Sequence, residues 1–210
     1  MLKQDRSRRT HEVLLDAAAG EFVRHGYAGA NLNRIADQVG MSKGALYAHF
    51  SSKEDLAGAL TKPFDQAWRG LLEEADAVRS DPLGALQCLT FGLAGRLRID
   101  IRFRAGLHLV SEGARAHGEV PTLIDDMTRA TTRLVRQAQQ QGELKPTHAP
   151  EALSSFVVAS TFGMYHTMSQ QRLDDFLHEA RRIWQLVFSS AAACPATPLP
   201  RGATVGAPLG

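Results

Sequence analysis

Cysteine is scarce in this sequence, with only Cys88 and Cys194 among 210 residues. The two lie far apart, and Cys194 falls in a stretch rich in proline and glycine, which excludes a disulfide framework and a cysteine-based metal site. The formal net charge is also low, at +2, so bulk electrostatics alone does not indicate nucleic-acid binding. Because 44% of the residues are hydrophobic, we expect a chain that folds around its own core in a reducing setting.

Long uninterrupted apolar stretches are missing as well. Asp16 and Glu21 break the segment that follows the basic N-terminus, which argues against a secretory signal. Residues 152–171 carry no formally charged side chain and have the length of a membrane span, but their many Ser, Thr and Gln residues and His166 argue against one. We therefore expect a cytoplasmic protein in which this segment is a buried interface helix.

Strand signals are absent too, since the sequence has no Asn-Gly or Asp-Gly turn and no sustained alternation of β-branched residues. Apolar residues recur at helical spacing instead, which predicts an all-α fold of about nine helices. We expect an N-terminal three-helix domain over residues 1–55 and a C-terminal helical domain over residues 56–193. The Pro- and Gly-rich tail, residues 194–210, is predicted to be disordered.

Three helices are expected in the N-terminal domain. The first covers about residues 8–25 and ends at Gly26, a residue suited to a left-handed C-cap. The second begins at Asn31, a good N-cap, and ends at Gly40, and the third begins at Ser42. The first ten residues hold four basic side chains and one acidic one; such an arm is more often a disordered, solvated terminus than a DNA contact.

The C-terminal domain is expected to begin with a long connecting helix. Ser51 and Glu54 have the spacing of a capping box at its start, and Pro63 should bend it. The last two helices, over residues 150–171 and 173–193, are apolar on more than one face. A helix wetted on one side would not have that pattern, so we expect these two to pack against a partner chain and form a homodimer.

The second and third helices have the spacing of a helix-turn-helix. The turn between them contains Gly40, and the third helix presents small and polar groups outward. Spacing alone leaves an ordinary corner between two helices equally open.

Residues 26–56 resemble the DNA-binding signature of the TetR family. The elements that carry this resemblance are Gly26-Tyr27, Ile35-Ala36, Gly40, Ser42-Lys43-Gly44, Leu46-Tyr47, His49-Phe50, Lys53 and Leu56. The resemblance implies a homodimeric transcriptional repressor that binds a pseudo-palindromic operator with the helix-turn-helix. It also implies that the C-terminal helices sense a small, largely apolar molecule.

Nine residues are candidate DNA contacts: Asn31, Asn33, Ser42, Lys43, Gly44, Ala45, Tyr47, His49 and Lys53. Gly44 lacks a Cβ, which would allow the recognition helix to approach bases or phosphates closely. Lys43 is placed to contact a base or a phosphate, and Tyr47 offers a positioning hydroxyl. We expect Lys53 to clamp the flanking DNA backbone. For His49, a phosphate contact and a structural role at the helix end are equally open.

Few of these residues are suited to direct base reading. Lys43 and Asn33 are the candidate base readers, and Ala45 offers an apolar contact to a thymine methyl group. Ser42 caps the recognition helix, and its exposed backbone amides would lie beside a phosphate. Asn31 keeps the capping chemistry of the Thr that the family usually has there. Much of the specificity is therefore expected from spacing and DNA shape.

The C-terminal helices resemble the γ-butyrolactone receptors of actinomycetes, through Arg104-Ala105-Gly106-Leu107, Phe162-Gly163-Met164 and the run to Trp184. Receptors of that branch have a pocket tryptophan where this chain has Met127, which lacks an indole N–H and a flat face. The resemblance thus points to a γ-butyrolactone or to a related furan, butenolide or antibiotic-like effector. The candidate pocket residues, which also fit a plain core, are Phe91, Leu107, Met127, Phe162, Met164 and Tyr165.

Enzyme signatures are missing, since no Gly-x-Ser-x-Gly, phosphate-binding lysine loop or dinucleotide fingerprint occurs. His108 and Glu112 share a helix face, but nothing nearby completes a metal site. We expect no catalytic activity, cofactor or bound metal. The alternatives that stay open are a transcriptional activator of the same fold and a helical small-molecule binding protein or enzyme.

Overall fold

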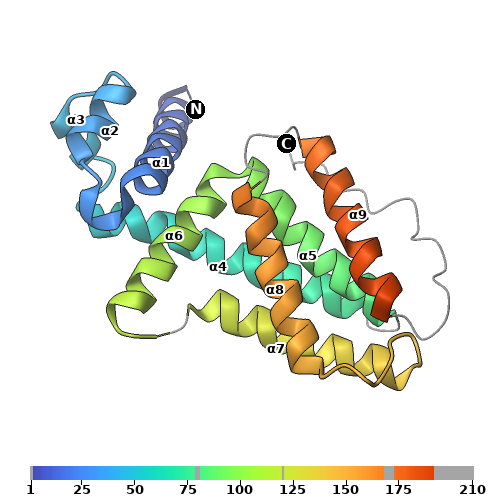
Figure 1. Cartoon of the computed structure of the whole chain (residues 1–210). Coiled ribbons are helices and arrows are strands. Elements are labelled where there is room, and N and C mark those ends of the chain that lie inside the picture. Colours follow the sequence, from blue (N-terminus) through green and yellow to red (C-terminus); the bar gives the residue numbers. More distant parts are fainter. Residues whose placement is uncertain (1, 79–80, 120, 168–172, 192–210) are drawn as a thin grey trace. The chain divides into compact units, whose positions relative to one another are not determined.

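The computed structural model describes residues 2–78, 81–119, 121–167 and 173–191, and these residues form nine α-helices and no β-strand (Figure 1). The all-α prediction is confirmed, while the predicted disordered tail, residues 194–210, lies outside the described residues. The helices are α1 (Leu2–Gly29), α2 (Leu32–Gln38), α3 (Lys43–Tyr47), α4 (Lys53–Ala77), α5 (Pro82–Ile99), α6 (Ile101–Ala116), α7 (Thr122–Gln140), α8 (Pro150–Thr167) and α9 (Leu173–Ala191).

The chain divides into two compact units, residues 1–68 with 100–123 and residues 69–99 with 124–210. We call them the first and the second unit. The first unit contains α1, α2, α3 and α6, because α6 packs along α1. The expected division into a DNA-binding domain, residues 1–55, and a ligand-binding domain, residues 56–193, stays a prediction. By packing alone, α6 belongs with the N-terminal helices.

The core of the first unit forms where the apolar faces of its helices meet. Its most deeply buried members include Leu14, Phe22, Ile35, Leu46, Phe50, Leu56 and Ala105. Leu46 and Phe50 come from α3 and the turn after it, so the short α3 is held by its inner side chains. This packing leaves the opposite face of α3 exposed.

The second unit is organised around α5, on which both α8 and α9 pack. Its core includes Leu86, Phe91, Leu134, Val157, Phe176 and Trp184. The Trp184 ring is 5.7 Å from the Phe91 ring and stacks on the Phe188 ring at 4.2 Å, measured between centroids. An aromatic cluster therefore links α5 to α9.

The basic N-terminal segment is helical, which corrects the expectation of a disordered arm and of a first helix that begins near residue 8. α1 begins at Leu2, and the side chains of residues 5–9 are exposed. The sequence has no glycine or proline before Gly20, so nothing in it ends the helix sooner. The expected left-handed C-cap at Gly26 is wrong, because Gly26 has a φ of +66° with a ψ of 179° and forms a kink, after which α1 extends to Gly29.

The cap of α4 also differs from the prediction. Ser52 Oγ accepts a hydrogen bond from the Asp55 amide (3.0 Å), and Asp55 Oδ2 accepts one from the Ser51 amide (2.9 Å). The capping pair is thus Ser52 and Asp55 in place of Ser51 and Glu54. Both pairs have the same spacing, so the pattern could not separate them. α4 continues through Pro63 to Ala77.

Candidate nucleic-acid interface

Side-chain caps define the start of both helices of the expected helix-turn-helix. Asn31 Oδ1 accepts a hydrogen bond from the Asn33 amide (2.8 Å), and Ser42 Oγ accepts one from the Ala45 amide (3.2 Å). Gly40, in the turn, has a φ of +67°, which favours glycine. The predicted N-caps at Asn31 and Ser42 are confirmed, and α2 and α3 have the lengths and connection of a helix-turn-helix.

The outer face of α3 is open to solvent. Lys43, Gly44 and Tyr47 are exposed, and the Tyr47 side chain is 42% exposed although it is large and aromatic. A Cβ added to Gly44 would meet nothing within 4 Å. No contact inside the described chain therefore requires glycine at this position. Ala45 is half-buried beside this face, and Lys43 Nζ lies 5.8 Å from the centroid of the Tyr47 ring.

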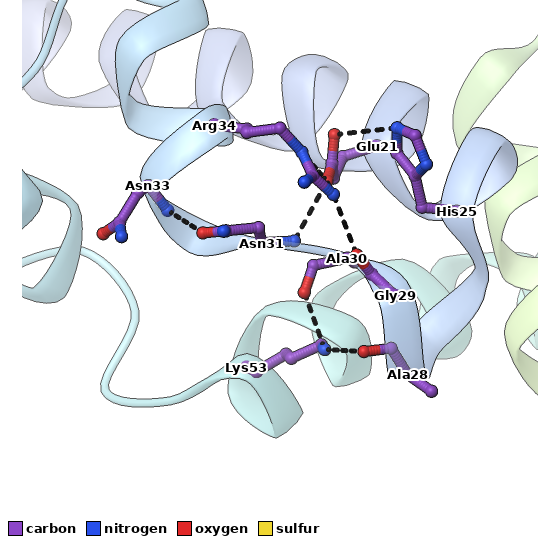
Figure 2. Close-up of polar contacts among 9 residues, drawn as sticks. All are labelled: Glu21, His25, Ala28, Gly29, Ala30, Asn31, Asn33, Arg34 and Lys53. Carbon is purple, nitrogen blue, oxygen red and sulfur yellow. Dashed lines mark hydrogen bonds and ion pairs between the residues drawn. The ribbon is translucent and has the colours of Figure 1, made fainter.

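A buried carboxylate fixes the segment between α1 and α2 (Figure 2). Glu21 of α1 is only 3% exposed, and its Oε1 accepts hydrogen bonds from the Asn31 amide (2.9 Å) and from Arg34 Nε (2.8 Å) and Nη2 (2.5 Å). Arg34 Nη2 also donates to the Gly29 carbonyl at 2.8 Å. The guanidinium thus ties the start of α2 to the end of α1.

The electrostatics of this site favour the ionised carboxylate. Burial by itself would raise the pKa of Glu21, but the hydrogen bonds from Arg34 and the Asn31 amide and the nearby charge of Arg34 outweigh it. The pKa of Glu21 therefore lies below its ordinary value. His25 Nε2 is 3.8 Å from the other carboxylate oxygen, and its charge acts in the same direction when the ring is protonated.

Lys53, the predicted clamp on DNA, contacts the same segment from the first turn of α4 (Figure 2). Its Nζ donates to the carbonyls of Ala28 (3.2 Å) and Ala30 (2.8 Å) and lies 4.9 Å from the centroid of the Tyr27 ring. An ammonium group has one further N–H to offer. Its role toward DNA stays a prediction, and its role inside the chain is to hold the turn between α1 and α2.

α6 holds α1 at two places. Arg102 donates to Asp16 Oδ1 (2.7 Å) and to Glu12 Oε2 (2.5 Å), and ten residues later Glu112 Oε2 accepts from the Tyr27 amide (2.6 Å). The contacts at 12, 16 and 27 on α1 follow the same order as those at 102 and 112 on α6, so the two helices run in the same direction. The orientation of α1 is therefore fixed along its length.

Sequence reasoning missed four of these residues: Glu21, Arg34, Arg102 and Glu112. Glu21 carried a signal, because a charged residue next to Phe22 interrupts the apolar stripe of α1. Its partner lies thirteen residues away and has no periodic relation to it. Glu112 was noticed only as a possible metal ligand, because a contact to a backbone amide leaves no mark in a sequence.

The other candidate DNA contacts lie around this scaffold. Asn33 is exposed on α2, and His49 is half-buried just beyond the end of α3. Eight of the nine candidates thus come from α2, α3 and the residues directly beside them, and the ninth, Lys53, is the first residue of α4. Their individual roles toward DNA stay predictions.

The candidate pocket residues are less closely grouped. Phe91 and Met164 belong to the core of the second unit, where Met127 is also completely buried and Phe162 is partly exposed. Leu107 is buried in the first unit. Tyr165 is in α8, but its side chain lies outside the described residues.

A narrow crevice lies between α8 and α9. It is lined by Phe156, Val157, Ser160, Met164, Ile183, Trp184, Val187 and Phe188. Of the five candidate pocket residues whose side chains are described, Met164 alone is among this lining, and the lining is almost entirely apolar.

The described part of the chain supports neither a membrane span nor a metal site. No helix there is long and apolar enough to cross a membrane. No cluster of three or more metal-ligating side chains occurs in residues 2–78, 81–119, 121–167 and 173–191. Glu112, one half of the weighed metal pair, is engaged by the Tyr27 amide.

Residues 14–60, which include α2 and α3, match the family model described as bacterial regulatory proteins, tetR family. The chain is also similar to the A-factor receptor protein of Streptomyces griseus, with 34% identity over 168 residues. That match covers 78% of this chain and 56% of the receptor. The chain therefore spans little more than half the length of this relative.

Two solved structures extend the similarity beyond the helix-turn-helix. One, described as the molecular basis for control of antibiotic production by bacterial hormones, is 31% identical, with a TM-score of 0.62 over 88% of this chain and 98% of that one. The other is CprB from Streptomyces coelicolor in complex with its operator sequence, 27% identical, with a TM-score of 0.68 over 87% and 88% of the two chains.

Proposed function

The chain belongs to the TetR family of DNA-binding regulators and is similar to its γ-butyrolactone receptors, and from this premise we propose that it is a homodimeric repressor. It binds a pseudo-palindromic operator in the cytoplasm and leaves it when a small, largely apolar effector binds. The observation that carries this proposal is the exposed face of α3, mounted on a scaffold that charged hydrogen bonds hold in place.

The chemistry of α3 supports insertion into a major groove. Its outer face combines a cation, Lys43, with the open backbone at Gly44 and the hydroxyl of Tyr47. A groove about 12 Å wide admits one helix, and a helix without a side chain at its centre approaches the base edges more closely. The solved CprB complex supports an operator as the partner.

The apolar surface of α8 and α9 supports the homodimer. Phe156 on α8 is 50% exposed and Leu186 on α9 is 73% exposed, beside the crevice between these helices. Large apolar side chains exposed to this degree are costly in water and are typical of a surface that a partner covers. We expect Leu186→Glu to give monomers in sedimentation while leaving the helical content unchanged.

The second unit supports an apolar effector with a polar end. Met127 and Thr131 lie one turn apart on the same face of α7, and both are completely buried. Thr131 Oγ1 has no hydrogen-bond partner among the described residues, so its hydroxyl is available to a ligand carbonyl. A lactone or butenolide carries a carbonyl next to an apolar body, and a furan or an antibiotic-like molecule fits if it carries a carbonyl substituent.

Release follows if the effector prefers the conformation that does not fit DNA. Two half-sites one turn apart require recognition helices about 34 Å apart, so a change of a few ångströms prevents simultaneous binding. A coupling free energy of about 1 to 3 kcal/mol is sufficient for a useful switch.

Binding to duplex fragments from upstream of its own gene tests the proposal. A dimer with several phosphate contacts should lose about a thousandfold in affinity between about 50 and 200 mM salt. Lys43→Ala should reduce the steepness of log affinity against log salt by about one. Lys145 is an exposed lysine of the second unit, so the control variant Lys145→Ala should leave this slope unchanged. Absence of binding to these fragments at every salt concentration would contradict the proposal.

The sign of regulation and the effector need separate measurements. A reporter behind the bound fragment should be less active when the protein is present; higher activity would identify an activator. A thermal-stability screen against lactones, furans, butenolides and antibiotics should find the effector, since a ligand at 100 times its Kd adds about 2.7 kcal/mol to the free energy of unfolding.

A further inference from the structure

Two imidazole rings lie beside each other at the end of α3. His11 of α1 and His49, two residues after α3, have ring centroids 6.2 Å apart, and the His11 ring stacks on Phe50 at 4.7 Å. Phe50 is 2% exposed, whereas both histidines are only partly buried. The stack therefore anchors His11 to the core while leaving part of its ring at the surface.

Neither imidazole has a polar partner within the described residues. His25, by contrast, lies 3.8 Å from Glu21, and His117 Nδ1 lies 2.8 Å from the Gly113 carbonyl. No hydrogen bond or ion pair in the described part of the chain involves the ring nitrogens of His11 or His49. Both rings thus have donors available for a group outside the chain.

We infer that His11 and His49 together contact a DNA phosphate, an inference that rests on the DNA binding proposed above. α3 has five residues, a length of about 7.5 Å, and the major groove is about 12 Å wide. Residues that flank so short a helix are within reach of the phosphates that border the groove. For His49 this selects the phosphate contact over the purely structural role, and it adds His11, which the sequence pattern did not single out.

The charges on the surrounding elements leave this pair free to bind an anion. The ionisable residues near the two histidines along the chain are Arg8 and Glu12 on α1, Lys43 on α3, and Lys53 and Asp55 on α4. Glu12 is bonded to Arg102, and Asp55 is bonded to Ser51. The two nearby carboxylates are thus engaged elsewhere, and the remaining neighbours are cations that a phosphate would also attract.

A phosphate contact made by imidazoles depends on pH. An imidazole gains its positive charge within the range from about pH 8 to 5, and only the charged ring releases a counterion when it neutralises a phosphate. The affinity for DNA should therefore rise as the pH falls through this range. The dependence of affinity on salt should become steeper at the same time.

Binding to a random-sequence duplex of about 30 base pairs, three helical turns, tests this inference, because phosphate contacts do not depend on sequence. Between about pH 8 and 6 the wild-type affinity should rise roughly threefold to tenfold, and the salt slope should steepen by about one to two. His11→Gln and His11→Phe should each remove about half of the rise. His11→Phe keeps a ring on Phe50, so it separates loss of charge from loss of packing. His178→Gln, an exposed histidine on α9, is the matched control.

The outcomes separate this inference from the proposed function. If both His11 variants keep the full wild-type rise while DNA binding persists, the inference is wrong and the proposed function stands. A rise that only His49→Gln removes also overturns the role of His11. If the wild-type protein binds no duplex at any pH, both the inference and the proposed function fail.

Discussion

The two units differ in their buried polar groups: among the described residues, the first unit buries a carboxylate that joins two helices, whereas the second unit buries hydroxyls and has its ion pairs between helices at the surface. The one buried charged side chain among the described residues is Glu21, which joins α1 to α2. The buried polar residues of the second unit are Thr90, Thr131, Ser154 and Thr161. Thr90 and Thr161 donate to carbonyls of their own helices, and such bonds do not orient one helix against another. Ser154 Oγ of α8 donates to the Thr128 carbonyl of α7 (3.0 Å), so a single buried hydroxyl among the described residues joins two helices of this unit.

This difference matches the two tasks of the proposed regulator. A helix that reads DNA must be presented in one orientation. Directional bonds from Glu21, Arg102 and Glu112 fix α1 and the start of α2, and α3 packs into the same core through Leu46 and Phe50. A domain that adapts to an effector is better served by apolar packing, which tolerates small shifts between helices.

The largest expected effect is on Glu21. Glu21→Ala should lower the free energy of unfolding by about 2 to 3 kcal/mol, because it leaves the Asn31 amide and the partly exposed Arg34 without their acceptor. Thr161→Val, the matched change at a buried polar residue of the second unit, should cost less than about 1 kcal/mol. Urea denaturation measures both, and equal losses would break the comparison.

Two glycines with positive φ give the next test. Gly26→Ala and Gly142→Ala both place a side chain at a positive φ, +66° and +76°, which costs about 1 kcal/mol or more. At Gly26 the ψ of 179° makes the conformation one that glycine alone adopts readily, so the cost there is about 1 to 3 kcal/mol. At Gly26 the new Cβ would also lie 2.3 Å from Glu112 Oε1, whereas at Gly142 it meets nothing within 4 Å. Gly26→Ala should therefore cost about 2 to 3 kcal/mol, because the bond to the Tyr27 amide is lost as well. A chemical-denaturation midpoint that falls no further for Gly26→Ala than for Gly142→Ala would show that the Glu112 contact contributes nothing.

Acid unfolding sharpens the comparison further. The pKa of Glu21 is lower in the folded state than its ordinary value of 4.5, so its contribution is fully present above about pH 4.5 and is lost as the pH falls through the folded value. Glu21→Gln should flatten the decline in stability between about pH 5 and 3. If the stability of the variant declines as steeply as that of the wild type, protonation of Glu21 is not the cause of the acid destabilisation.

The smallest expected effect has the opposite sign and belongs to the second unit. Burial, with the nearby charge of Asp81, raises the pKa of Glu143 although the Leu83 amide lowers it. The protonated form therefore stabilises the fold at low pH, and that stability is lost as the pH rises through the folded value. Glu143→Gln should be more stable than the wild type at pH 7, by about 0.5 kcal/mol or less, and no different at pH 3. A thermal midpoint at pH 7 below that of the wild type would contradict this sign.

The same difference explains how far the sequence could be interpreted. The all-α fold and the N-caps at Asn31 and Ser42 follow from local rules that each segment carries in itself. The motif of residues 26–56 then identified the family. Local rules failed at the start of α4, because two possible capping pairs, one beginning at Ser51 and one at Ser52, have the same spacing.

Contacts between distant segments were out of reach. Glu112 bonds to a backbone amide eighty-five positions away, and Arg102 reaches Glu12 over ninety. In the second unit an apolar residue at helical spacing fits a core and a pocket equally well, so periodicity could not decide which of Phe91, Met127 and Met164 face an effector. Exposure of Phe156 and Leu186, in turn, depends on how α8 and α9 pack on α5.

The claim that α3 contacts DNA is tested by hydrogen exchange of the full chain, measured by mass spectrometry with and without a duplex that the protein binds. We expect bound DNA to add protection to residues 31–50, around α3, while α9 of the second unit exchanges as it does without DNA. A complex that forms with no added protection at residues 42–50, or with protection confined to α9, would contradict it.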